Sequence, residues 1–137
     1  MINSGRLSTP TPYRQSPLNT DDESPFAGKM LPGTNAADAP VTVNGREGWL
    51  LNELGDGFTL LSFGPAPQAE VTCGGVKAKV LTVGQDIADV ASVLTARYDG
   101  RPGTVYLLRP DQHVAARWRS FDVRKIEAAL RRCLGLS

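Results

Sequence analysis

The hydrophobic pattern in the second half of the chain predicts the strands of a sheet. Residues 58–63 (FTLLSF) are almost continuously apolar and are followed by a Gly-Pro pair, which predicts a central strand covered on both faces. Residues 76–83 (VKAKVLTV) begin with alternating apolar and lysine positions, which predicts an edge strand with one face in water. Two further apolar runs, 104–108 and 113–118, are separated by the turn sequence RPDQ. We therefore expect these last two strands to form an antiparallel hairpin.

Two segments with helical spacing are predicted to flank the sheet. The first begins at Asp86 as N-cap and ends at Gly100. Its apolar stripe is formed by Ile87, Val90, Leu94 and Tyr98. The second begins at Asp122 and ends before Gly135, and Phe121 precedes its cap as part of a hydrophobic staple. Its buried stripe is formed by Val123, Ile126, Leu130, Cys133 and Leu134.

The compact domain is predicted to begin at Trp49. Residues 49–54 have the pattern of a short helical or turn segment that ends at Gly55-Asp56-Gly57. From there the chain alternates strands and helices, which indicates an α/β or α+β layer with a mixed sheet.

Residues 1–48 have a different character and are called the strap below. They contain six of the ten prolines, and proline removes amide donors and favours extended backbone before it. We therefore expect an irregular, extended course over another part of the protein. Large apolar residues are spaced along the strap as anchors, which a solvated linker does not need. These anchors are Tyr13, Leu18, Phe26 and Leu31.

Charge is distributed unevenly although its sum is small. Residues 1–56 hold four basic and seven acidic side chains, whereas residues 97–132 hold nine basic and four acidic ones. The two regions are therefore expected to attract each other weakly. The formal net charge of +1 gives no overall attraction to nucleic acid or to an anionic membrane, and neither is predicted as a partner.

Length and composition indicate one ordinary domain. The chain has 137 residues, 41% of them hydrophobic and 21% charged, which is typical of globular proteins. It has no basic stretch followed by an apolar run near its start, and no run approaches the ~18 residues of a membrane span. Cys73 and Cys133 fit neither a zinc site nor a Cys-x-x-Cys pair. These features favour a reducing, cytoplasmic location.

Residues 97–118 (RYDGRPGTVYLLRPDQHVAARW) look like the second half of a thioredoxin-like domain. Together with Pro32-Gly33, Ala39-Pro40 and residues 57–61 (GFTLL), they resemble the C-terminal domain of FAD-dependent aromatic-ring hydroxylases. These are flavoprotein monooxygenases of the phenol hydroxylase and 3-(3-hydroxyphenyl)propionate hydroxylase kind. The resemblance covers the whole chain. It implies that residues 49–137 form a thioredoxin-like mixed four-stranded sheet with flanking helices, preceded by the extended strap.

Two departures from related proteins bear on chemistry. The place of the thioredoxin Cys-x-x-Cys is taken by residues 64–68 (GPAPQ), so no thiol pair is available there. The resemblance implies that FAD and NAD(P)H belong to a parent enzyme, whose N-terminal domain would hold FAD through a Gly-x-Gly-x-x-Gly turn. This chain lacks that motif, and Gly55-Asp56-Gly57 precedes a strand instead of opening a helix. The chain is thus either an excised C-terminal domain or a free-standing relative of one.

Candidate reactive groups are few, and each has a plainer structural interpretation. His113 could be a general base or metal ligand, but a solvent-facing strand residue is favoured. Residues 21–23 (DDE) could bind a cation, although a solvated turn is favoured. Trp49 and Trp118 are interpreted as core or docking aromatics, and a cis or a trans bond before Pro102 is equally expected.

A basic cluster in the last third of the chain is interpreted as a solvated or domain-docking face, in preference to a phosphate or nucleic-acid site, because acidic residues interrupt it. Its members are Arg117, Arg119, Arg124, Lys125, Arg131 and Arg132.

The leading hypothesis is a non-catalytic docking domain of an FAD- and NAD(P)H-dependent aromatic-ring monooxygenase. The expected partners are the FAD and substrate domains of that parent, and a second copy in a homodimer. No residue is assigned to catalysis, cofactor binding or metal binding. Two alternatives stay open: an autonomous thioredoxin- or peroxiredoxin-like enzyme with Cys73 as nucleophile, and a free-standing protein-binding module.

Overall fold

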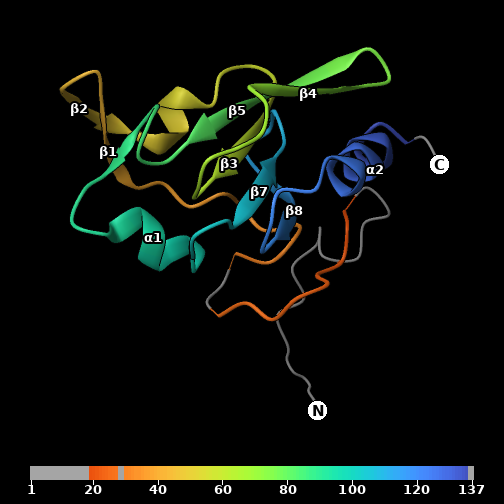
Figure 1. The fold of residues 1–137 in the computed structure, drawn as a ribbon, viewed down its shortest axis with the longest axis horizontal. Helices are drawn as coiled ribbons and strands as arrows, with labels where there is room; N and C mark the ends of the chain where they lie inside the picture. Colours follow the sequence, from red (N-terminus) through yellow and green to blue (C-terminus); the bar gives the residue numbers. More distant parts are fainter. Residues whose placement is uncertain (1–18, 28–29, 136–137) are drawn as a thin grey trace.

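The computed structural model describes residues 19–27 and 30–135 (Figure 1). The elements in chain order are β1 (Pro40–Val43), β2 (Arg46–Trp49), the 3₁₀ helix η1 (Leu50–Glu53), β3 (Phe58–Ser62), β4 (Glu70–Cys73), β5 (Val76–Thr82), β6 (Ala88–Asp89), α1 (Val93–Tyr98), β7 (Val105–Leu108), β8 (Val114–Trp118) and α2 (Val123–Cys133). They form a mixed α/β fold consistent with a thioredoxin-like domain, as predicted.

The main sheet has five strands in the order β4-β5-β3-β7-β8. β3 runs parallel to β5 and antiparallel to β7, so it is central, as its continuous apolar run predicts. The predicted number of four strands is wrong, because β4 pairs antiparallel with β5. β5 is therefore not the edge strand expected for residues 76–83. Lys77 and Lys79 are exposed nonetheless, and Lys77 lies 3.4 Å from Glu70 of β4.

A second, three-stranded sheet has the order β2-β1-β6. β1 and β2 form a hairpin, so the irregular course predicted for the strap is wrong for residues 40–48, which form this hairpin. Asn44 and Gly45 both have positive φ, 51° and 78°. Positive φ at both central residues is typical of the type I′ turn, whose backbone twist matches that of the two strands in a hairpin. The division of the chain between residues 48 and 49 stays a prediction.

The predicted helix start at Asp86 is wrong. Helix α1 begins at Val93, because Ala91 and Ser92 adopt left-handed backbone with φ of 53° and 60°, which a helix cannot pass through. Asp86 instead accepts a hydrogen bond from the Thr82 amide at 2.8 Å. The amides of the first turn of α1 are bound by Asp89, which accepts from Leu94 at 2.9 Å and Thr95 at 3.0 Å.

The remaining elements agree with the sequence. Asp122 caps α2 by accepting from the amides of Arg124 and Lys125, and β7 pairs antiparallel with β8 as a hairpin. η1 is the short helical segment expected within residues 49–54, although Trp49 itself belongs to β2. No peptide bond among the described residues is cis, so the bond before Pro102 is trans.

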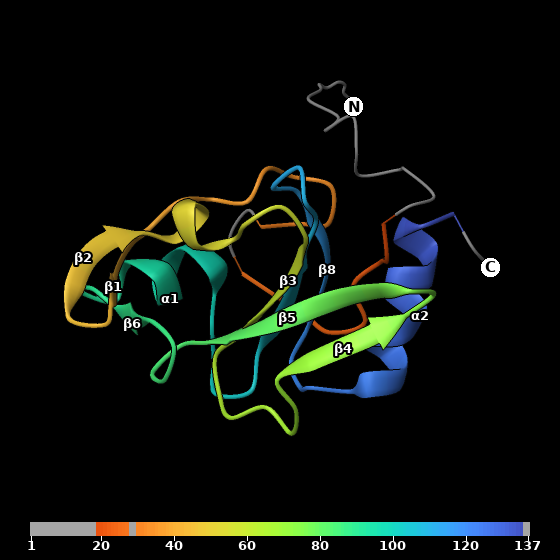
Figure 2. The same cartoon turned by 90° about the horizontal axis from the view of Figure 1, so that it is seen from above.

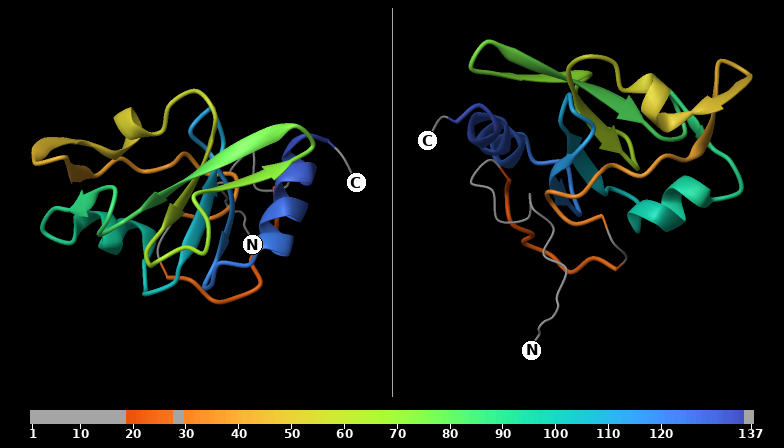
Figure 3. Two further views of the ribbon diagram at one scale, coloured as in Figure 1. Left: turned by 45° about the horizontal axis from the view of Figure 1, so that its top comes forward. Right: turned by 180° about the vertical axis from the view of Figure 1, so that it is seen from behind.

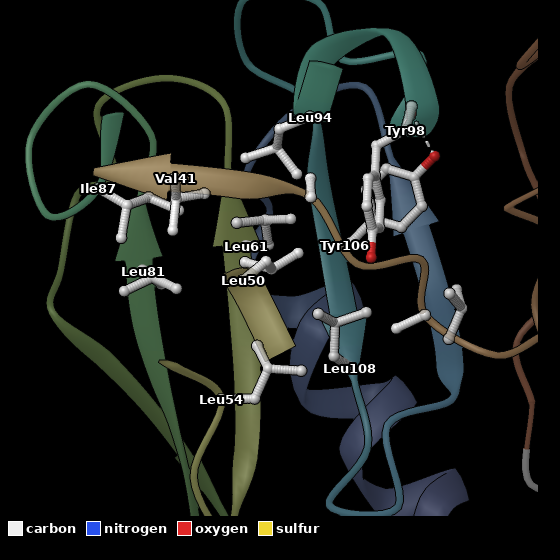
Figure 4. Close-up of a cluster of buried hydrophobic side chains, with 13 residues drawn as sticks. Val41, Leu50, Leu54, Leu61, Leu81, Ile87, Leu94, Tyr98, Tyr106 and Leu108 are labelled. Atoms are coloured by element: carbon white, nitrogen blue, oxygen red, sulfur yellow. Dashed lines mark hydrogen bonds between the residues drawn. The ribbon is translucent and has the colours of Figure 1, made fainter. Parts of the chain in front are cut away.

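Both faces of the main sheet are covered (Figure 2). On one face, α2 packs through Ile126 and Leu130 against a cluster that includes Leu60. On the other face, Leu61, Tyr98 and Tyr106 pack with residues of β1, η1 and α1 (Figure 4). Consecutive side chains of a strand point to opposite faces, so Leu60 and Leu61 contribute to different cores.

Candidate docking site beneath the strap

The described start of the strap lies along β8 and α2 (Figure 3). The basic cluster of the last third of the chain supplies most of its partners. Arg132 Nε donates to the carbonyl oxygen of Asn19 at 2.9 Å. The ammonium group of Lys125 lies 2.6 Å from a Glu23 carboxylate oxygen, with both side chains about half exposed. The attraction expected between the two regions is therefore realised as specific contacts.

Arg117 forms the most buried of these contacts. Its side chain is 2% exposed, and it binds Asp22 through two hydrogen bonds of 2.9 and 2.7 Å. A further contact of 3.5 Å joins it to the Tyr106 hydroxyl. Burial alone lowers the pKa of Arg117, but the hydrogen bonds with Asp22 and Tyr106 outweigh burial and raise it above its ordinary value. The guanidinium is therefore charged, and Asp22 neutralises it.

Phe26 is an apolar anchor of the strap, as predicted. Its ring lies against two guanidinium groups, with the Cζ atoms of Arg117 and Arg119 at 4.2 and 3.8 Å from the ring centroid. Tyr106 meets it edge-on, with ring centroids 5.9 Å apart. Leu31 is half-buried. The other two predicted anchors, Tyr13 and Leu18, lie outside the described residues.

Asp99 and Arg119 tie the strap to the end of α1. The Asp99 carboxylate accepts from the Ala27 amide at 2.7 Å and from Arg119 at 2.5 Å. These two hydrogen bonds, the one from Ala27 first, hold the pKa of Asp99 below its usual value of 3.8. Arg119 also donates to the Asp99 carbonyl oxygen at 2.6 Å and to that of Pro25 at 3.3 Å.

The strap also covers the outer edge of β8. The Thr20 amide donates to Ala115 at 3.0 Å, and the Gly33 amide donates to Val114 at 2.6 Å. Val114 in turn donates to Thr34 at 2.8 Å. An edge strand with unpaired backbone groups is a template for further pairing. The strap therefore occupies the groups that would otherwise pair with another chain.

Residues 21–23 were expected to form a solvated turn, but two of these three acidic residues form ion pairs with the domain. Asp22 pairs with Arg117, which is 95 positions away, and Glu23 pairs with Lys125. The opposite charge of the two regions was the signal available for these pairs. No group of three or more His, Cys, Asp or Glu side chains that could hold a metal ion occurs among the described residues.

The other candidate residues do not come together with this site. His113 lies at the turn of the β7–β8 hairpin, where its Nδ1 is 3.3 Å from an Asp111 carboxylate oxygen. Cys73 ends β4 and pairs with Val76, the first residue of β5. Cys133 ends α2, packs half-buried against the core, and burial raises its pKa to about 11. A thiol with that pKa stays protonated at neutral pH and is a poor nucleophile.

The two tryptophans differ in their surroundings. Trp118 is buried in the core beneath α2. Trp49 is 51% exposed and borders a shallow hollow of about 440 Å³ on the small sheet, together with Pro40, Thr42 and Val90. Trp49 is the exposed large hydrophobic side chain of the described residues.

Comparison with known families gives one match. The sequence model described as aromatic-ring hydroxylase, C-terminal, matches residues 29–136. A search of curated proteins gives no match. Within the part of the chain that the structure describes, no helix is long and apolar enough to cross a membrane.

Solved structures share the fold. Aklavinone-11 hydroxylase, in a ternary complex with FAD and aklavinone, aligns with a TM-score of 0.69 and 23% identity over 88% of this chain and 26% of its own. The flavin-dependent monooxygenase PieE, in complex with FAD and substrate, aligns with a TM-score of 0.71 and 21% identity over 88% of this chain and 24% of its own. RebC soaked with chromopyrrolic acid, with bound 7-carboxy-K252c, aligns with a TM-score of 0.62 and 22% identity over 90% of this chain and 23% of its own. The chain spans about a quarter of the length of these proteins.

Proposed function

Because the chain belongs to the family of aromatic-ring hydroxylase C-terminal domains, we propose that it serves an FAD- and NAD(P)H-dependent aromatic-ring monooxygenase as a non-catalytic docking domain. The family match over residues 29–136 carries this proposal. Two of the solved structures with this fold hold FAD, and in each the shared region is about a quarter of the chain. The FAD and substrate domains of the parent are then the partners of this domain.

The described residues do not fit a flavin site of their own. Binding of the FAD pyrophosphate needs backbone amides at a glycine-rich turn from a strand into a helix. Gly55 and Gly57 lie between η1 and β3, and Gly74 and Gly75 lie between β4 and β5, so both turns lead into a strand. The hollow beside the first of these turns has a volume of about 190 Å³ and is lined in part by Lys77 and Lys79. The proposed contribution of the domain is therefore structural.

We expect the purified chain to be colourless and inactive as a hydroxylase and as a disulfide reductase. Titration of FAD with the protein should leave flavin fluorescence unchanged, and insulin reduction should match that of a Cys73→Ser variant. Micromolar flavin binding would show that the domain contributes directly to the cofactor site. Dithiol turnover lost in Cys73→Ser would instead establish the thioredoxin-type enzyme.

We also propose that the isolated chain forms a two-fold homodimer. The described strap anchor Phe26 is already packed against its own domain, so the exposed Trp49 face supplies the apolar surface. A symmetric contact places the same patch of both copies together. Sedimentation at micromolar concentration should give a dimer for the wild type and a monomer for Trp49→Ser. A monomeric wild type contradicts the proposal.

A further inference from the structure

The surface under residues 19–27 has the chemistry of a peptide-binding site and is here called the strap-binding surface. It is formed by the outer edge of β8 at Ala115 and by the side chains of Asp99, Arg117, Arg119, Lys125 and Arg132. The segment that fills it contains no helix or strand. It is held at Asn19, Thr20, Asp22, Glu23, Pro25, Phe26 and Ala27.

Two of these positions dominate recognition. Asp22 is the carboxylate that neutralises Arg117, whose side chain is 2% exposed; without an acid, a buried charge would be left uncompensated. Phe26 supplies the ring that lies against Arg117 and Arg119, where cation–π attraction adds to burial. The Glu23–Lys125 pair is half exposed and therefore contributes little. The strap-binding surface thus selects an extended segment with an acid and, four positions later, an aromatic residue.

The occupying segment makes few apolar contacts with the domain. Most of residues 19–27 are exposed, and Phe26 is their one large apolar contact with the core. Segments with few buried apolar contacts open locally at a lower free energy than the whole fold. Apart from Phe26, the residues that form the two cores on the faces of the main sheet lie outside this segment.

We propose that the strap-binding surface is a recognition site for an acidic–aromatic segment, occupied in cis by residues 19–27, and that it accepts the same residues of a second copy in trans. The second copy is the occupant favoured by charge complementarity, since its Asp22 and Phe26 match Arg117 and Arg119 by sequence identity. A covalently attached segment has an effective concentration on the order of millimolar. Binding of the segment from a second copy therefore becomes measurable when substitutions weaken the binding of the attached segment. This inference does not depend on the proposed flavin-containing parent.

The test is binding of a labelled peptide of residues 19–27 to the full chain, followed by fluorescence polarisation. We expect the Asp22→Ala/Phe26→Ala chain to bind this peptide at least 10-fold more tightly than the wild-type chain, whose own strap competes. A peptide carrying Phe26→Ala should lose at least 10-fold in affinity, whereas a peptide carrying Glu23→Ala should stay within about 3-fold, because its ion pair is exposed.

If the Asp22→Ala/Phe26→Ala chain does not fold, the chain with the single conservative substitution Phe26→Leu takes its place in the same binding measurement. Far-ultraviolet circular dichroism establishes which variant is folded. Equal peptide binding by wild-type and folded variant chains overturns the proposal, as does equal affinity of the wild-type and Phe26→Ala peptides. Absence of peptide binding to every folded variant overturns it as well.

Discussion

Leu60→Ala and Leu61→Ala are each expected to lower the free energy of unfolding by about 2–5 kcal/mol, the range for removing a buried leucine side chain. Both side chains are fully buried. Leu60 packs in the cluster beneath α2 and Leu61 in the cluster beneath α1 and η1. In a sheet with one face in water, only one of two consecutive residues would carry such a cost. Thermal or urea unfolding of the two variants measures it directly.

The matched control for these variants is Thr72→Ala on the edge strand β4. Thr72 is exposed, so its replacement should change stability by less than about 0.5 kcal/mol. A small effect of either leucine variant, comparable to that of Thr72→Ala, would contradict the two-sided burial of β3. Large effects of both would establish it in solution.

The sequence predicts the centre of this fold better than its edges. The apolar run of residues 58–63 is long enough to indicate a strand buried on both faces, and β3 is that strand. β4 has four residues, of which only Val71 is buried, and so short a pattern does not distinguish a strand from a loop. Because β4 is not predicted, the lysines of residues 76–83 indicate that this segment is an edge strand. In the structure β4 pairs with it and forms the edge instead.

The start of α1 was missed for a different reason. Ile87, Leu94 and Tyr98 are all buried, as the helical stripe from Asp86 predicts, but Ile87 precedes the short strand β6. The left-handed backbone at Ala91 and Ser92 separates the two parts. Neither residue type favours that conformation, so the sequence carries no local signal of the break.

The site beneath the strap depends on pairs that local patterns do not contain. Phe26 could be predicted as an anchor because a large apolar residue in a proline-rich strap requires a partner. Its partners Arg117 and Arg119 follow only from how the strap crosses β8. The charge asymmetry between the two regions indicates that they attract each other, but it does not specify which acid binds which base.

Asp22→Ala is expected to increase the fraction of molecules in which residues 19–27 are detached from the domain by about 30-fold, which corresponds to about 2 kcal/mol. Removing one partner of a buried ion pair costs about 3–5 kcal/mol, and we use a lower value because Asp22 itself is 23% exposed. Chymotrypsin cleavage after Phe26 measures this fraction, because the ring must leave Arg117 and Arg119 before a protease can bind it. When opening and closing are fast relative to cleavage, the cleavage rate follows the open population.

Glu23→Ala is the matched control, since it removes the neighbouring carboxylate from the same segment and leaves Phe26 in place. Its partner Lys125 is 47% exposed, so this variant should change the cleavage rate by less than about 3-fold. The difference between the two variants separates a specific loss of Arg117 neutralisation from a general loss of negative charge. Equal acceleration by both variants would mean that the strap is held by net charge alone. No acceleration by Asp22→Ala would mean that the buried pair does not hold the strap, and that the hydrogen bonds along β8 and at Asp99 are sufficient.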